Sequence, residues 1–149
     1  MRILVLNGPN LNLLGSREPA VYGQKSYDEI VAEIRRHCQQ KKVQVRVQQT
    51  NHEGVLVDYI QQAKGVFAGI VINPAAYTHT SIAIPDALTA VGIPAVEVHL
   101  TDPITREAFR RRSYIRAACI DTVVGKGWKG YLEAVDLLLA YLQGKQKNE

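Results

Sequence analysis

Five short apolar runs, alternating with helical patterns, constrain the fold of this chain more than any other feature. The runs are rich in β-branched residues: RILVL (2–6), VQVRVQ (43–48), VFAGIVI (66–72), AVEVH (95–99) and CIDTVV (119–124). The third run is apolar almost throughout, as expected of a strand that is buried on both faces of a sheet. Strands that alternate with helices predict one α/β domain over residues 1–149 with a five-stranded parallel sheet.

Four helical patterns accompany these runs. The segment SYDEIVAEIRRHC (26–38) opens with the S-x-x-E spacing of a capping box and carries apolar residues on one face. Two further helices are predicted over 55–63 and 81–91, and a last helix from about Gly130 places Tyr131 on its apolar stripe.

Composition argues against a disulfide-stabilised, a membrane-spanning and a metal-binding protein. The two cysteines, Cys38 and Cys119, form no CxxC pair, which indicates free thiols in a reducing cytoplasm. The longest apolar run is too short to span a bilayer, and no metal-binding spacing is present. The net charge of +4 owes much to REAFRRRSYIR (106–116), which either forms a solvated face or contacts a polyanion.

Polar residues follow four of the predicted strands, at the edge where open parallel sheets bind ligands. They are NGPNLN (7–12), QQTNHE (48–53), NPAAYTHT (73–80) and His99. Asparagine after a strand often serves only as a turn residue. Their concentration at one edge, together with a histidine, favours a binding pocket there.

Two groups at this edge suit acid chemistry and the binding of an anion or a polyol. The two-residue period of a strand places Glu97 and His99 on the same face, so the carboxylate would favour a protonated imidazole able to act as a general acid. The alternative is a histidine packed at a strand end. The loop from Asn73 to Ser81 precedes a helix and contains His79, which suits an anionic or polyhydroxylated ligand, although its hydroxyls also suit a helix N-cap.

The stretch GSREPAVYG (15–23) contains Arg17 and Tyr22 without helical or strand periodicity. An arginine close to a tyrosine favours the ionised phenolate, which could act as a base; a packed ring in a surface loop is the alternative. The segment GKGWKG (125–130) matches a dinucleotide-binding pattern, but no strand follows it, so a glycine-assisted start of the last helix is the better interpretation.

Four segments together, LNGPNLNLLGSREPAVYG, INPAAYTHTSIAIPDAL, VEVHL and REAFRRRSY, resemble the type II 3-dehydroquinate dehydratases in order and spacing. The resemblance implies a flavodoxin-like three-layer sandwich with strand order 2-1-3-4-5. It also implies a homododecamer built as a tetramer of trimers, and no partner among membranes or nucleic acids. The implied reaction is the reversible anti elimination of water from 3-dehydroquinate to 3-dehydroshikimate through an enolate-like intermediate, without a metal, an organic cofactor or a Schiff base.

The same resemblance implies a role for individual residues. Tyr22 corresponds to the base that removes the C2 proton, with Arg17 favouring tyrosinate, and His99 to the acid oriented by Glu97. Asn10 would hold a water on the enolate oxygen. The substrate-binding positions are Asn73, His79 and Arg110, the amides of Leu100 and Thr101 for the carboxylate, and Asp86 from a neighbouring subunit. Arg106 corresponds to a second arginine that, with Arg17, contributes to the site electrostatics.

The chain departs from the family pattern at Thr101-Asp102, where Ser-Asn is typical, and at Ala75, where glycine is common. Thr101 keeps the hydroxyl, whereas Asp102 adds negative charge near an anionic substrate. The reaction serves either the shikimate pathway of aromatic amino acid biosynthesis or quinate catabolism. Two other classes of function are a nucleotide- or RNA-binding module that uses the arginine cluster and a non-catalytic assembly subunit.

Overall fold

Five parallel strands form the central layer of the computed structural model, which describes residues 1–16 and 18–149. Their order is β2-β1-β3-β4-β5, and every neighbouring pair runs parallel. The flavodoxin-like order predicted from the sequence is therefore confirmed. The strands are β1 Arg2–Asn7, β2 Gln44–Gln49, β3 Gly69–Asn73, β4 Ala95–Val98 and β5 Asp121–Val123.

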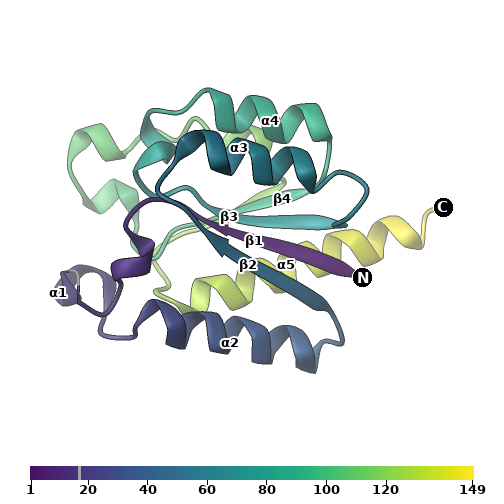
Figure 1. Cartoon of the computed structure of the whole chain (residues 1–149), viewed down its shortest axis with the longest axis horizontal. Coiled ribbons are helices and arrows are strands. Elements are labelled where there is room, and N and C mark those ends of the chain that lie inside the picture. Colours follow the sequence, from purple (N-terminus) through teal and green to yellow (C-terminus); the bar gives the residue numbers. More distant parts are fainter. Residues whose placement is uncertain (17) are drawn as a thin grey trace.

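Two pairs of helices cover the sheet, one pair on each face (Figure 1). Figure 1 shows α2 and α5 on one side and α3 and α4 on the other, with short α1 beyond the ends of the strands. Their bounds are α1 Pro19–Tyr22, α2 Tyr27–Gln40, α3 Glu53–Gln62, α4 Ala83–Val91 and α5 Lys129–Gln146. The capping box at the start of α2 is present, since Ser26 and Glu29 each accept the other's backbone N–H.

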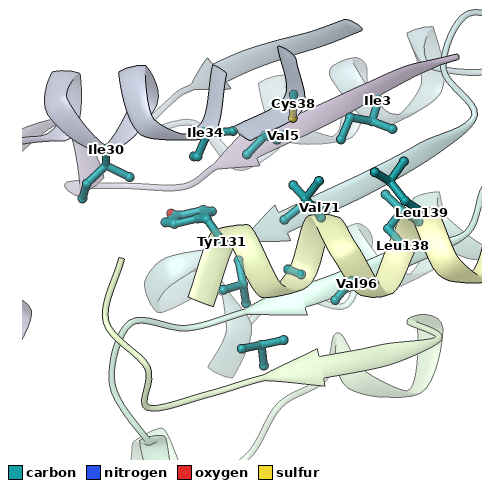
Figure 2. Close-up of a cluster of buried hydrophobic side chains, with 14 of the residues drawn as sticks. Ile3, Val5, Ile30, Ile34, Cys38, Val71, Val96, Tyr131, Leu138 and Leu139 are labelled. Atoms are coloured by element: carbon teal, nitrogen blue, oxygen red, sulfur yellow. The ribbon is translucent and has the colours of Figure 1, made fainter. Parts of the chain in front are cut away.

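Side chains alternate between two hydrophobic layers along each central strand. On β1, Ile3 and Val5 face α2 and α5, whereas Leu4 and Leu6 face α3 and α4. The first layer, drawn in Figure 2, joins the sheet to Ile30 and Ile34 of α2 and to α5 from Tyr131 to Leu142. The sheet is thus buried on both faces, which explains why β3 is wholly apolar until Asn73.

Strand boundaries differ from the sequence prediction mainly at β3, which begins at Gly69 rather than at position 66. The amides of Val66 and Phe67 both donate to the carbonyl of Ala63, so these residues complete the turn after α3 instead of extending. The other strand ends shift by only one or two residues. None of the helices within the described residues is long and apolar enough to cross a membrane.

The carboxyl ends of β1 and β3 are locked together. The amide of Gly8 donates to the carbonyl of Asn73 at 2.8 Å. A Cβ on Gly8 would lie 2.3 Å from the carbonyl oxygen of Pro74, so only glycine allows this approach. The stretch 15–23, predicted without regular structure, contains one helical turn in α1, and it leads Tyr22 back toward the strand ends.

Candidate active site

A pocket lies at the carboxyl ends of the strands. Most of the residues singled out from the sequence line it, although they come from segments far apart in the chain. Two arginines make its wall electropositive, which suits an anionic ligand. The lining consists of Pro9, Asn10, Leu11, Tyr22, Asn73, Ala75, Ala76, His79, His99, Leu100, Thr101, Pro103, Arg106 and Arg110.

Tyr22 meets an arginine in this pocket. Nη1 of Arg106 donates to the phenol oxygen at 2.7 Å, and the guanidinium carbon lies 5.3 Å from the ring centroid. This hydrogen bond raises the pKa of Arg106 further above its ordinary value. The positive charge of Arg106 therefore faces the oxygen that would carry negative charge in a tyrosinate. Arg17, the partner expected from the sequence, lies outside the described residues.

Glu97 and His99 lie together where β4 ends. Nε2 of His99 is 3.3 Å from Oε1 of Glu97, whose side chain is completely buried. Burial raises the pKa of Glu97, but the interactions with His99, Ser113 and Arg116 outweigh burial and hold this pKa below its ordinary value. Glu97 therefore presents an ionised carboxylate to the His99 ring.

Ser113 and Arg116 hold that carboxylate, and sequence reasoning assigned a role to neither. The hydroxyl of Ser113 donates to the Glu97 carboxylate, 2.6 Å from Oε1 and 3.0 Å from Oε2, and accepts the backbone N–H groups of Ile115 and Arg116. Nε of Arg116 lies 3.9 Å from Oε2 of Glu97. Ser113 belongs to the REAFRRRSY motif, so the motif contained the signal, but its partner is 16 residues away.

Asn73 is held from behind the pocket by a tyrosine of α5. Its Nδ2 donates to the hydroxyl of Tyr131 at 3.1 Å, and its Oδ1 accepts the N–H of Ala75. The Tyr131 hydroxyl in turn donates to Oδ1 of Asn7 at 2.5 Å. Ala75 has a φ of 53°, in the left-handed region, which gives a physical reason for glycine at this position in the family pattern.

Contacts with neighbouring loops hold Asn10 and His79, which both line the pocket. The amide of Asn10 donates to Oδ1 of Asn51, a residue in the polar segment after β2. The carbonyl of Asn51 also accepts the hydroxyl of Tyr77. Nδ1 of His79 lies 2.7 Å from the carbonyl of Arg112, which can only accept, so Nδ1 carries the proton.

The remaining predicted residues divide between the pocket and the surface. Leu100 and Thr101 line the pocket, as does Arg110, whose Nε donates to Glu107. Asp102 does not line it; its carboxylate accepts the N–H of Ile104 and caps a short turn, so its charge is directed to that turn. Asp86 is exposed on α4 and is not part of this chain's pocket.

The arrangement combines a phenol beside a guanidinium with an imidazole backed by a buried carboxylate. Such a pair can remove a proton at one atom of a ligand and donate a proton to a leaving group at another. The family model for class II dehydroquinases matches residues 1–139 of this chain. The chain belongs to the class II dehydroquinases.

Individual members of the family are similar over nearly the whole chain. The 3-dehydroquinate dehydratase 2 of Pseudomonas aeruginosa is 52% identical over 134 residues, which cover 90% of each chain. The catabolic 3-dehydroquinase of Verticillium alfalfae is 44% identical and covers 98% of this chain and 97% of its own. The crystal structure of type II dehydroquinase from Butyrivibrio crossotus matches with a TM-score of 0.92 and 48% identity, covering 93% of this chain and 97% of that one.

Proposed function

We propose that this dehydroquinase catalyses the reversible anti elimination of water from 3-dehydroquinate to 3-dehydroshikimate. The observation that carries the proposal is the placement of Tyr22, with Arg106 on its oxygen, and of His99, with Glu97 behind it, in one pocket. Elimination next to a ketone needs a base, an acid for the departing hydroxyl, and stabilisation of the developing oxyanion.

Tyr22 supplies the base in this proposal. Arg106 lies within hydrogen-bond distance of the phenol oxygen and stabilises a tyrosinate by its charge. The tyrosinate removes the proton from C2, and the electrons move toward the ketone oxygen to form an enolate. Asn10, which also lines the pocket, holds the water that contacts this oxygen. We also assign Arg17 to the stabilisation of the tyrosinate, on the resemblance alone.

His99 supplies the acid. The ionised carboxylate of Glu97 stabilises the imidazolium, which protonates the C1 hydroxyl as it leaves. The remaining lining residues bind the substrate. Asn73, His79 and Arg110 contact its hydroxyl and carboxylate groups, and the amides of Leu100 and Thr101 bind the carboxylate, because free amides and guanidinium groups suit an anion.

The pathway and the assembly complete the proposal. We assign the enzyme to the shikimate pathway in the cytoplasm, with quinate catabolism as the alternative that uses the same reaction. We also propose a homododecamer in which Asp86 of one subunit reaches the site of the next. Asp86 is exposed, and beside it Ile82, just before α4, leaves 55% of its surface open, as an interface residue would.

Turnover of 3-dehydroquinate, followed as the ultraviolet absorbance of the conjugated enone product, tests the function. We expect activity in the wild-type chain, unchanged by a chelator. Tyr22→Phe removes the base and should lower kcat by about 10²–10⁴-fold, with substrate binding retained by calorimetry. Tyr141→Phe, on an exposed face of α5, is the matched control and should keep full activity.

Full activity of Tyr22→Phe would overturn the mechanism, and an inactive wild-type chain would overturn the function. Binding to RNA that weakens with salt, without turnover, would instead support the nucleic-acid module.

A further inference from the structure

We propose that Tyr131 is a positioning residue for substrate binding, because its buried hydroxyl sets the orientation of the Asn73 side-chain amide. The inference rests on the proposed function, in which Asn73 contacts the substrate. It concerns a residue that does not line the pocket, and whose place on an apolar helix stripe indicates only a core role.

The hydroxyl of Tyr131 bridges two strand ends. Tyr131 is 1% exposed, and Figure 2 shows its ring on the first turns of α5, facing α2, with its oxygen directed away from Leu138 and Leu139. It donates to Oδ1 of Asn7 at the end of β1 and accepts Nδ2 of Asn73 at the end of β3. The sequence separations are 124 and 58 residues, so this hydroxyl links α5 to two strand ends that lie far from it in the sequence.

The direction of these hydrogen bonds determines what Asn73 offers to a ligand. A phenol has one proton, and here that proton goes to Asn7, so the oxygen can only accept from Asn73. Asn73 must therefore turn its NH₂ group toward Tyr131 and its carbonyl oxygen toward the N–H of Ala75. The second amide proton and the second lone pair of Asn73, which lines the pocket, are then left in a fixed order for a ligand.

Burial keeps the hydroxyl of Tyr131 protonated. Burial raises the pKa of Tyr131 far above its ordinary value, with the hydrogen bond from Asn73 opposing the shift only in part. The hydroxyl therefore remains a donor to Asn7 throughout the pH range in which an enzyme operates. Of the two amide partners of this hydroxyl, Asn73 lines the pocket, so the contact reaches the binding site.

The test is a double-mutant cycle on the full-length enzyme with 3-dehydroquinate as substrate. Tyr131→Phe keeps the ring and removes the hydroxyl, so the Asn73 amide keeps its contact with Ala75 but loses the acceptor that holds its NH₂ group. We expect KM to rise roughly three- to tenfold with kcat nearly unchanged, as for the loss of one hydrogen bond in binding. In an Asn73→Ala background the same change should add nothing to KM. Tyr141→Phe, on the same helix but 40% exposed, is the control.

A second variant covers the case in which Tyr131→Phe does not fold. Asn7→Leu keeps the volume, removes the acceptor that directs the hydroxyl, and should raise KM in the same direction. An unchanged KM in both variants, or a Tyr131→Phe effect of equal size with and without Asn73, would overturn the inference while the function stood. An inactive wild-type chain would overturn the proposed function, and the inference with it.

Discussion

Ser113 is a single residue whose hydroxyl, together with His99, stabilises the ionised carboxylate of Glu97. Its contacts with both carboxylate oxygens favour the ionised form and help to hold the pKa of Glu97 below its ordinary value, against burial. In Ser113→Ala these contacts are lost while burial remains, so we expect this pKa to rise. The acid limb of kcat/KM, where protonation of Glu97 releases His99, should then move to higher pH.

The pH profile of Ser113→Ala, with Ser113→Thr as the control that keeps the hydroxyl, checks this prediction. Because the pKa of Glu97 is lower in the folded protein than in the unfolded protein, ionised Glu97 stabilises the fold at pH values above its unfolded-state pKa. This contribution to the free energy of unfolding is lost as the pH falls through the folded-state pKa. The variant should therefore also unfold more easily at neutral pH, by about 1.5–3 kcal/mol for hydrogen bonds to a charged group. An acid limb identical to that of the wild type would show that Ser113 does not act through Glu97.

At the residue scale, the two-residue period of a strand predicted which side chains of that strand lie side by side. The sequence did not predict contacts between residues that only the folded chain brings together. Glu97 and His99 are two positions apart on one strand, so their contact follows from local geometry. Tyr22 and Arg106 are separated by 84 residues, and no periodicity indicates that they meet. Only the resemblance to a family placed an arginine there.

At the scale of the secondary-structure elements, Gly8 allows the carboxyl ends of β1 and β3 to lie close together. A methyl group there would lie 2.3 Å from one backbone atom of Pro74 and 2.6 Å from another, and backbone cannot rotate away as a side chain can. We expect Gly8→Ala to lower the free energy of unfolding by about 1–3 kcal/mol or more. It should also raise KM, because the shift displaces Asn73.

Urea unfolding and steady-state kinetics measure both effects. Gly144→Ala is the control: it lies in α5 with no atom within 4 Å of the added carbon, and it should stabilise the protein by up to about 1 kcal/mol. Equal stability of Gly8→Ala and the wild type would show that the two strand ends are not locked by this contact.

The order of elements was predictable because each signal is local. Apolar strands, the capping box of α2 and the polar residues after each strand all read directly from spacing. The start of β3 was predicted wrongly because Val66 and Phe67 are apolar but belong to the turn after α3, where Phe67 is buried and Val66 is exposed. Apolar residues in a turn extend the pattern of the strand that follows, so hydrophobicity alone does not mark where the strand begins.

The whole molecule raises the question of whether one chain contains a complete site. Asp86 is absent from the pocket lining although the family pattern gives it a substrate-binding role. In the proposed dodecamer each complete site takes Tyr22 from one chain and Asp86 from a neighbour. Sedimentation should then give a particle twelve times the chain mass of 16.6 kDa.

Complementation between two impaired variants tests this sharing of a site. Asp86→Ala should weaken turnover without changing the assembly, and Tyr22→Phe should nearly abolish it. When both chains are co-expressed, some Asp86→Ala subunits lie beside Tyr22→Phe subunits, which supply the intact Asp86 to an intact Tyr22. Activity of the mixed oligomer should therefore exceed that of either variant alone. If Asp86 served its own chain, every site would lack one group, and mixing would restore nothing.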